Sequence, residues 1–146
     1  MTPRANNGGA ALADTSGLYA ILDRADRQHA IAAKSWIELL ESDRTVVLHD
    51  FVLLEVWSLI QARLGMDAVV VFHRDYLPLM TRISLTEEMV SRGMARCLGA
   101  ARRDLSLTDC VSFEVASHHG ITRAFALDRH FKEAGFLLPG DPSWQK

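Results

Sequence analysis

A short apolar segment that runs directly into a helical pattern, residues 10–22, constrains the fold of this chain more than any other stretch. Its small apolar residues at positions 10–13 suit a strand covered on both faces, as in a parallel sheet. Leu18, Ile21 and Leu22 follow at the spacing of one helix face. A buried strand followed at once by a helix is the repeating unit of an α/β fold.

Asp14 occupies the turn between that strand and that helix, and Thr15 and Ser16 follow it. Ligands of open α/β sheets bind at the carboxyl ends of the strands, so Asp14 is a candidate ligand or catalytic group. Thr15 or Ser16 is expected to cap the helix. A structural role stays open for Asp14 at this point, because an acid here can also accept bonds from backbone N–H groups.

Composition and charge narrow the class of protein. The 146 residues make one ordinary domain, and the hydrophobic fraction of 49% is typical of a globular chain. The formal net charge of -2 argues against a protein that binds nucleic acid through bulk charge, although it leaves room for a local basic patch. Cys97 and Cys110 form no CxxC pair, so no disulfide framework or zinc knuckle is indicated. Two free buried thiols fit a reducing, cytoplasmic location.

The two ends of the chain carry no clear helical or strand pattern. Residues 1–9 lack the apolar core of a signal peptide and are expected to form a flexible leader. Residues 139–146 are expected to form a mostly irregular tail. Residues 10–138 then make up the folded domain. No apolar run approaches membrane-spanning length, so no membrane association is expected.

Between these ends, short apolar strands alternate with helical patterns. Strands are predicted at 45–48, 82–85 and 122–127, with a candidate last strand at 135–139, and helices at 29–40, 51–64, 67–80, 87–101, 106–119 and 131–134. Residues 69–72 have strand propensity, but their neighbours keep a helical period, so they are assigned to a helix. The alternation predicts an α/β fold, a three-layer α/β/α sandwich around a short parallel sheet of four or five strands.

Four acids stand out by their positions, and three of them can be placed directly. Asp14 and Asp128 each follow a predicted strand. Glu55 is the only charged residue between Asp50 and Arg63 in a strongly apolar helix, so we expect it to be at least partly buried. A buried carboxylate is costly unless a cation pairs with it.

Asp109, the fourth acid, lies in the first turn of a helix that begins near Ser106. Taken alone, Ser106-x-x-Asp109 resembles a capping box, in which the helix dipole favours the acid. Four converging carboxylates would repel one another without a cation, and hard oxygen ligands favour Mg²⁺ or Mn²⁺ over zinc. Such a metal polarises a phosphoryl oxygen and activates a water, so the pattern points to metal-assisted hydrolysis of a phosphate ester.

Four segments in this order resemble the PIN-domain ribonucleases, and specifically the VapC-type toxins of bacterial toxin–antitoxin pairs. The segments are Ala-Asp-Thr-Ser at 13–16, Leu-Leu-Glu-Val at 53–56, Leu-Ser-Leu-Thr-Asp-Cys-Val-Ser-Phe at 105–113 and Gly-Ile-Thr-Arg-Ala-Phe-Ala-Leu-Asp-Arg-His-Phe at 120–131. The last two are the most specific, and the order and spacing hold from residue 11 to residue 138. The leader is longer than usual, and residues 65–101 carry no motif that assigns substrate contacts.

The resemblance implies a metal site formed by four acids: Asp14, Glu55, Asp109 and Asp128. Asp14, Asp109 and Glu55 are expected to hold a first Mg²⁺ or Mn²⁺, directly or through water. Asp128 is expected to support a second ion or to orient the attacking water. Thr15 or Ser16 matches a hydroxyl that helps to hold the first acid or a metal-bound water. The implied products are RNA ends with a 3′-hydroxyl and a 5′-phosphate.

The resemblance also implies partners. The substrate is expected to be a transfer RNA or another structured RNA, a small antitoxin is expected to cover the site, and homodimers are expected. Arg129 and His130 are candidate RNA contacts, with a charged surface turn as the alternative. Six apolar residues exceed what one helix face needs, and some of them are expected to form a dimer or antitoxin surface: Phe51, Leu54, Trp57, Val70, Phe72 and Tyr76.

Two other functions are weighed on the same residues. A non-cleaving PIN-like module that binds RNA or a protein would be favoured by the loss of one of the four acids, and none is lost. A phosphatase of the haloacid-dehalogenase kind needs a second Asp two residues after the first, where this chain has Ser16.

Overall fold

The structure is a computed structural model and describes residues 9–145. Residues 1–8 of the expected leader, and Lys146 of the expected tail, lie outside the described residues. The described chain forms a four-stranded sheet in the order β3-β2-β1-β4, and every pairing is parallel. The strands are β1 (Ala11–Ala13), β2 (Val46–His49), β3 (Thr81–Ile83) and β4 (Arg123–Phe125). The candidate fifth strand is reduced to one isolated bridge between Arg123 and Leu137.

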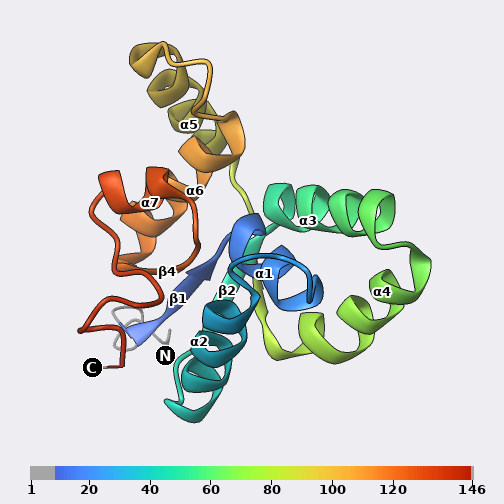
Figure 1. Cartoon of the computed structure of the whole chain (residues 1–146). Helices are drawn as coiled ribbons and strands as arrows, with labels where there is room; N and C mark the ends of the chain where they lie inside the picture. The colour runs from blue at the N-terminus through green and yellow to red at the C-terminus, as the bar shows by residue number, and fades with distance from the viewer. Residues whose placement is uncertain (1–8, 146) are drawn as a thin grey trace.

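Seven α-helices connect these strands (Figure 1). They are α1 (Thr15–Leu22), α2 (His29–Glu41), α3 (Asp50–Arg63), α4 (Met66–Val71), α5 (Glu87–Ala100), α6 (Leu107–His119) and α7 (Arg129–Glu133). The predicted helices are present with ends shifted by a few residues, except that only the first part of the helix predicted at 67–80 is a regular α-helix. α5 packs mainly along α6 and extends away from the sheet.

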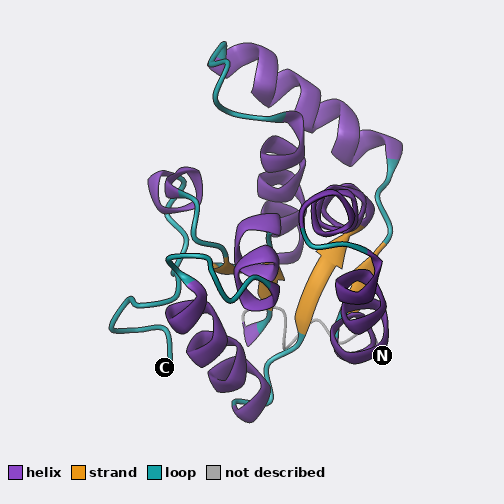
Figure 2. Cartoon of the chain, turned by 45° about the vertical axis from the view of Figure 1, so that its right-hand side comes forward, coloured by secondary structure: helices purple, strands orange, loops and turns teal. Residues whose placement is uncertain are grey.

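The sheet lies between two apolar layers because successive strand residues point to opposite faces. Ala11, Ala13 and Leu48 pack into one cluster with side chains of α1, α2 and α3. Leu12 and Val47 pack into a second cluster with side chains of α6 and α7. Figure 2 shows the strands enclosed by helices. The predicted three-layer α/β/α sandwich is confirmed.

The predicted helix at 67–80 is interrupted. It begins as α4, continues as a π-helical turn over Phe72–Tyr76 and ends as a 3₁₀ turn over Leu77–Leu79. Pro78 has no N–H group, so a regular helical ladder cannot continue through it. Of the six apolar residues from which a dimer or antitoxin surface is expected to draw, Phe72 is buried and is therefore not available to it, whereas Leu54 and Val70 are exposed.

The burial of the cysteines and of the C-terminal segment can be compared with the sequence predictions. Cys110 is buried, but Cys97 is only half-buried, so the expectation of two buried thiols is wrong for Cys97. In the expected tail, Trp144 is buried, and the guanidinium of Arg123 lies 5.7 Å from the centre of its ring. In the described part of the chain, no helix combines the length and apolar character needed to cross a membrane.

α1 lies directly against the end of β4, and Gly17 makes this approach possible. A methyl group at Gly17 would fall well inside contact distance of the carbonyl oxygen of Phe125. The same carbonyl accepts a hydrogen bond from the backbone N–H of Asp14, at 3.1 Å. The turn that carries Asp14 is therefore pressed onto the neighbouring strand end.

We predict that Gly17→Ala lowers the free energy of unfolding by about 1–3 kcal/mol, because the added methyl must push α1 off β4. Gly99→Ala is the matched control, since nothing lies within 4 Å of a methyl group there. That control should be neutral or stabilising by up to about 1 kcal/mol, because alanine favours helix. Urea unfolding measures both, and equal effects of the two changes would contradict the close packing.

His49 is a fully buried polar residue at the end of β2. Its Nδ1 accepts a hydrogen bond from the backbone N–H of Phe51 at 3.2 Å, which caps α3. Its Nε2 therefore carries the proton and donates to Oγ of Ser112, at 2.8 Å, on α6. Burial lowers the pKa of His49 to about 4, against the opposing attraction of Asp50.

This lowered pKa predicts a loss of stability in acid. The unfolded chain takes up a proton on His49 below about pH 6.5, whereas the folded chain resists it until about pH 4, so stability falls as the pH falls through this window. His49→Asn keeps the cap and cannot be protonated. Between pH 7.5 and pH 5, its free energy of unfolding should fall by about 2 kcal/mol less than that of the unchanged protein. Parallel urea titrations at the two pH values measure this, and an identical pH dependence would refute it.

Candidate active site

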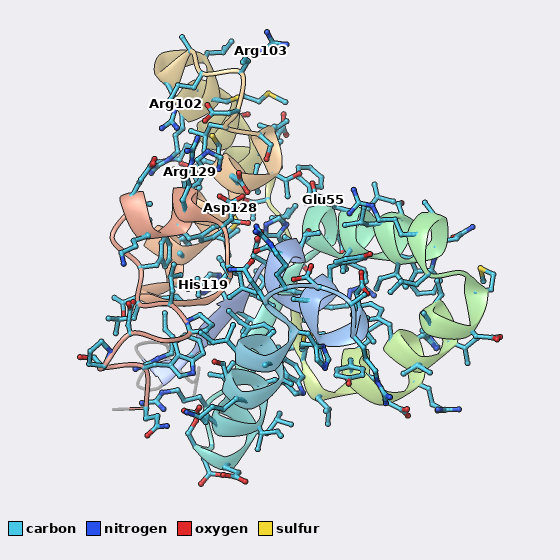
Figure 3. All side chains as sticks on the ribbon, in the orientation of Figure 1. Glu55, Arg102, Arg103, His119, Asp128 and Arg129 are labelled. Carbon is cyan, nitrogen blue, oxygen red and sulfur yellow. The ribbon has the colours of Figure 1, made fainter. Side chains whose placement is uncertain are left out.

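The fold brings the four predicted acids to one edge of the sheet. Asp14 follows β1, Asp128 precedes α7, Glu55 lies near the start of α3 and Asp109 lies in the first turn of α6. Figure 3 shows Glu55 on α3 and Asp128 beside α7 at a similar height, both below the projecting α5. Parallel strands end on the same side, and the helices that follow them begin there, so these positions converge.

Asp14 is held by its own turn and by the next strand. Its Oδ2 accepts hydrogen bonds from the backbone N–H of Ser16 at 3.1 Å and from Oγ of Ser16 at 2.6 Å. The Ser16 hydroxyl in turn accepts from the backbone N–H of Leu127 at 2.9 Å, just beyond β4. Asp14 is therefore the cap of α1, and the expectation that Thr15 or Ser16 caps this helix is wrong. Ser16 instead ties the first acid to the strand end that leads to Asp128.

The Asp14 carboxyl is buried among like charges. Burial is the main cause that raises its pKa to about 7; the hydrogen bonds from Ser16 oppose this rise, and the nearby charges of Asp109 and Glu55 add to it. The buried hydroxyl of the adjacent Thr15 has no hydrogen-bond partner among the described residues. A carboxylate in this position lacks the cation that its ionised form requires.

Asp109 uses its backbone for the helix and leaves its side chain for the site. Its N–H donates to Oγ of Ser106 at 3.1 Å, so Ser106 caps α6 as the sequence predicts. The Asp109 carboxyl is buried, and burial raises its pKa, helped by Asp128 and Glu55 and opposed by His130. Capping alone therefore does not explain the acid at this position.

Glu55 is exposed, so the expectation that it is at least partly buried is wrong. The side of α3 that enters the core carries Val52, Val56 and Ile60, and Glu55 lies off this stripe. Apolar neighbours in the sequence do not place a helical side chain in the core. The side chain is buried only if it lies on the helix face that packs against the core. Glu55 is still close enough to raise the pKa values of Asp14 and Asp109.

Asp128 and His130 form the other half of the edge. Oδ1 of Asp128 accepts from the backbone N–H of His130 at 2.9 Å and so caps α7. The His130 ring is buried, with Nδ1 at 2.9 Å from Oδ1 of Asp128 and 3.5 Å from Oδ2 of Asp109. The surface-turn alternative is therefore wrong for His130, whereas Arg129 is exposed.

A network of charged side chains surrounds the far side of the His130 ring. Asp104 accepts from Arg102 and Arg129 and lies 3.3 Å from Nε2 of His130, and Arg102 also reaches Glu133. The sequence analysis did not single out Asp104. The sequence does place Asp104 in the loop between Arg103 and the Ser106 cap. That position alone does not reveal that its carboxylate lies beside the start of α7, because the contact depends on the fold.

The arrangement fits a divalent cation. Asp14 and Asp109 are two buried carboxyls with raised pKa values, and within residues 9–145 no lysine or arginine forms an ion pair with any of the four acids. Asp109, Asp128 and His130 each offer a ligand atom, all within 4.8 Å of one another. Carboxylate-rich sites of this kind suit Mg²⁺ or Mn²⁺.

The comparisons with known proteins agree with this fold. The family model of the PIN domain matches residues 11–137, and the chain belongs to that family. The crystal structure of VapC20 from Mycobacterium tuberculosis, a toxin that cleaves the sarcin–ricin loop, is 26% identical and superposes with a TM-score of 0.77. The match covers 88% of this chain and 97% of that chain. No curated protein matches the sequence. The predicted resemblance to VapC-type PIN domains is confirmed.

The buried charge of Asp14 predicts an unusual effect of its removal. An acid whose folded-state pKa is about 7 stabilises the fold least above pH 7, where it must ionise, so stability falls as the pH rises from about 4 to 7. Asp14→Asn keeps an oxygen for Ser16 and removes the charge. With metal chelated at pH 8, this variant should be more stable than the unchanged protein by about 2–4 kcal/mol.

The same pair of proteins gives the control for metal. Mg²⁺ or Mn²⁺ should raise the melting temperature of the unchanged protein and should raise that of Asp14→Asn much less. Thermal unfolding with and without chelator measures both. A metal-free Asp14→Asn variant that is less stable at pH 8 would contradict the burial of an unpaired charge.

Proposed function

We propose that this protein is a metal-dependent endoribonuclease that hydrolyses RNA phosphodiester bonds and acts as the toxin of a toxin–antitoxin pair. The observation that carries this proposal is the convergence of Asp14, Asp109, Glu55 and Asp128 on one sheet edge of a PIN domain, with two of their pKa values raised. The loss of one of the four acids would favour the non-cleaving alternative, and none is lost.

Asp14 and Asp109 are the direct ligands in this proposal, because both are buried and the charge of Asp109 is close enough to raise the pKa of Asp14. Glu55, which is exposed, acts through a water molecule. When bound, Mg²⁺ or Mn²⁺ supplies charge to a phosphoryl oxygen and lowers the pKa of a water. Ser16 fixes the orientation of Asp14, since the same hydroxyl bonds both its carboxylate and the backbone of Leu127.

Asp128 lies on the opposite side of the edge, where it orients the attacking water or supports a second ion. The products, by likeness to the family, carry a 3′-hydroxyl and a 5′-phosphate. Arg129 is exposed beside Asp128 and is the proposed contact for an RNA phosphate. His130 is not proposed as an RNA contact, because its ring is buried between carboxylates.

The proposed substrate is a structured RNA, with a transfer RNA as one candidate. VapC20, to which the chain is similar, acts on the sarcin–ricin loop, which supports a folded loop as the target class. The proposed partners are an antitoxin and a second copy of the chain. Leu54 and Val70 are large exposed apolar residues on α3 and α4, and Leu54 is next to Glu55, so a partner that covers them also reaches the site.

Cleavage of a labelled structured-RNA pool tests the proposal. It should require Mg²⁺ or Mn²⁺, and Asp14→Asn and Asp109→Asn should each lower the rate by about 10²–10⁴-fold, since each removes a charge that acts on the reacting groups. Glu114→Gln is the control, because Glu114 pairs with Arg96 on α5, away from the four acids. Normal cleavage by Asp14→Asn would contradict the proposed site.

A further inference from the structure

We propose that His130 is itself a metal ligand, and that its Nδ1 completes a second cation position with Asp109 and Asp128. Asp104 is the positioning residue of this site, because it holds the far side of the ring. The inference rests on the proposed function for its setting, but its central test measures metal coordination and needs no RNA. It adds a nitrogen ligand to a site otherwise built from carboxylates.

The distances between the three groups carry the first step. Nδ1 of His130 is 2.9 Å from Oδ1 of Asp128 and 3.5 Å from Oδ2 of Asp109. Adjacent ligands of an octahedral ion with bonds of about 2.1 Å lie about 3 Å apart. Since all three ligand atoms also lie within 4.8 Å of one another, the three side chains are close enough to bind a single ion.

The state of the His130 nitrogen carries the second step. The side chain is more than nine-tenths buried, and its Nδ1 makes no aligned hydrogen bond among the described residues, although Oδ1 of Asp128 is near. The lone pair or N–H bond of Nδ1 therefore points to one side of the Asp128 Oδ1 atom and not directly at it. A nitrogen and an oxygen that share one cation have this relation, because both point at the ion and not at each other.

The far side of the ring carries the third step. Nε2 of His130 is 3.3 Å from Oδ2 of Asp104, which is also held by Arg102 and Arg129. Its ion pairs with the two guanidinium groups keep this carboxylate in the role of an acceptor. A proton on Nε2 then leaves the lone pair of Nδ1 free. Metal-binding histidines commonly donate their other N–H to a carboxylate in this way, and losing that carboxylate weakens metal binding by about 10–100-fold.

The donor set predicts which ions bind best. Two carboxylates and one imidazole suit a first-row transition dication, whereas Mg²⁺ prefers oxygen ligands and keeps several waters. The second position should therefore prefer Mn²⁺ to Mg²⁺. The first position, between Asp14 and Asp109, has only oxygen ligands and should discriminate less.

Electron spin-echo measurements on the full chain loaded with Mn²⁺ test the assignment directly. We expect nitrogen modulation from a coordinated imidazole, lost in His130→Gln. By calorimetry, His130→Gln should weaken Mn²⁺ binding about 10-fold or more and Mg²⁺ binding less than about 3-fold. Asp104→Asn should weaken Mn²⁺ binding about 10-fold. Glu133→Gln, which alters another partner of Arg102 but does not touch the ring, should leave Mn²⁺ binding unchanged.

Each outcome decides the matter. Mn²⁺ bound without nitrogen modulation, or equal weakening of Mg²⁺ and Mn²⁺ in His130→Gln, would show that the ring only separates the two acids and would overturn the inference. Modulation without cleavage of any RNA would support His130 as a ligand and contradict the proposed function. If Asp14→Asn lost cleavage but the unchanged protein gave no nitrogen signal, the proposed function would be supported and the assignment of His130 as a ligand would be contradicted.

Discussion

The burial of Asp14 at the end of β1 is the constraint on which the rest of the site depends. A carboxyl with a pKa of about 7 beside Asp109 and Glu55 is unfavourable for the metal-free fold once it ionises. The fold tolerates this because Ser16 gives the carboxylate two hydrogen bonds and fastens it to Leu127. Because this support holds the carboxylates together, their mutual repulsion is relieved when a cation binds. The relief of that repulsion adds to the affinity of the site for the cation.

That rigidity comes from close contacts around the sheet edge. Gly17 lets α1 press against the end of β4, and this brings the Asp14 turn next to the chain that leads to Asp128. His49 joins the start of α3 to Ser112, one turn beyond Asp109 on α6. Three segments distant in sequence are thus held at one edge by backbone contact and one buried polar bond, with no need of a disulfide.

Much of the fold could be predicted from sequence because it depends on local pattern. Apolar runs placed the strands, and Ser106 marked a helix start that the structure confirms. The misses depend on three-dimensional context. Glu55 is exposed because helix phase, not neighbour polarity, decides burial, and His130 is buried because α6 and the loop at Asp104 close over it. The convergence of the acids followed from strand direction, but the pairing of their side chains did not.

A crystal structure of the Mn²⁺-loaded protein, with anomalous scattering recorded at the manganese edge, tests the central claim that this edge is a metal site. The account predicts an anomalous peak between Asp14 and Asp109, and a second one bounded by Asp109, Asp128 and His130. A fully loaded protein with no peak within coordination distance of Asp14 or Asp109 would contradict it, and the four acids would then be helix caps and surface charges.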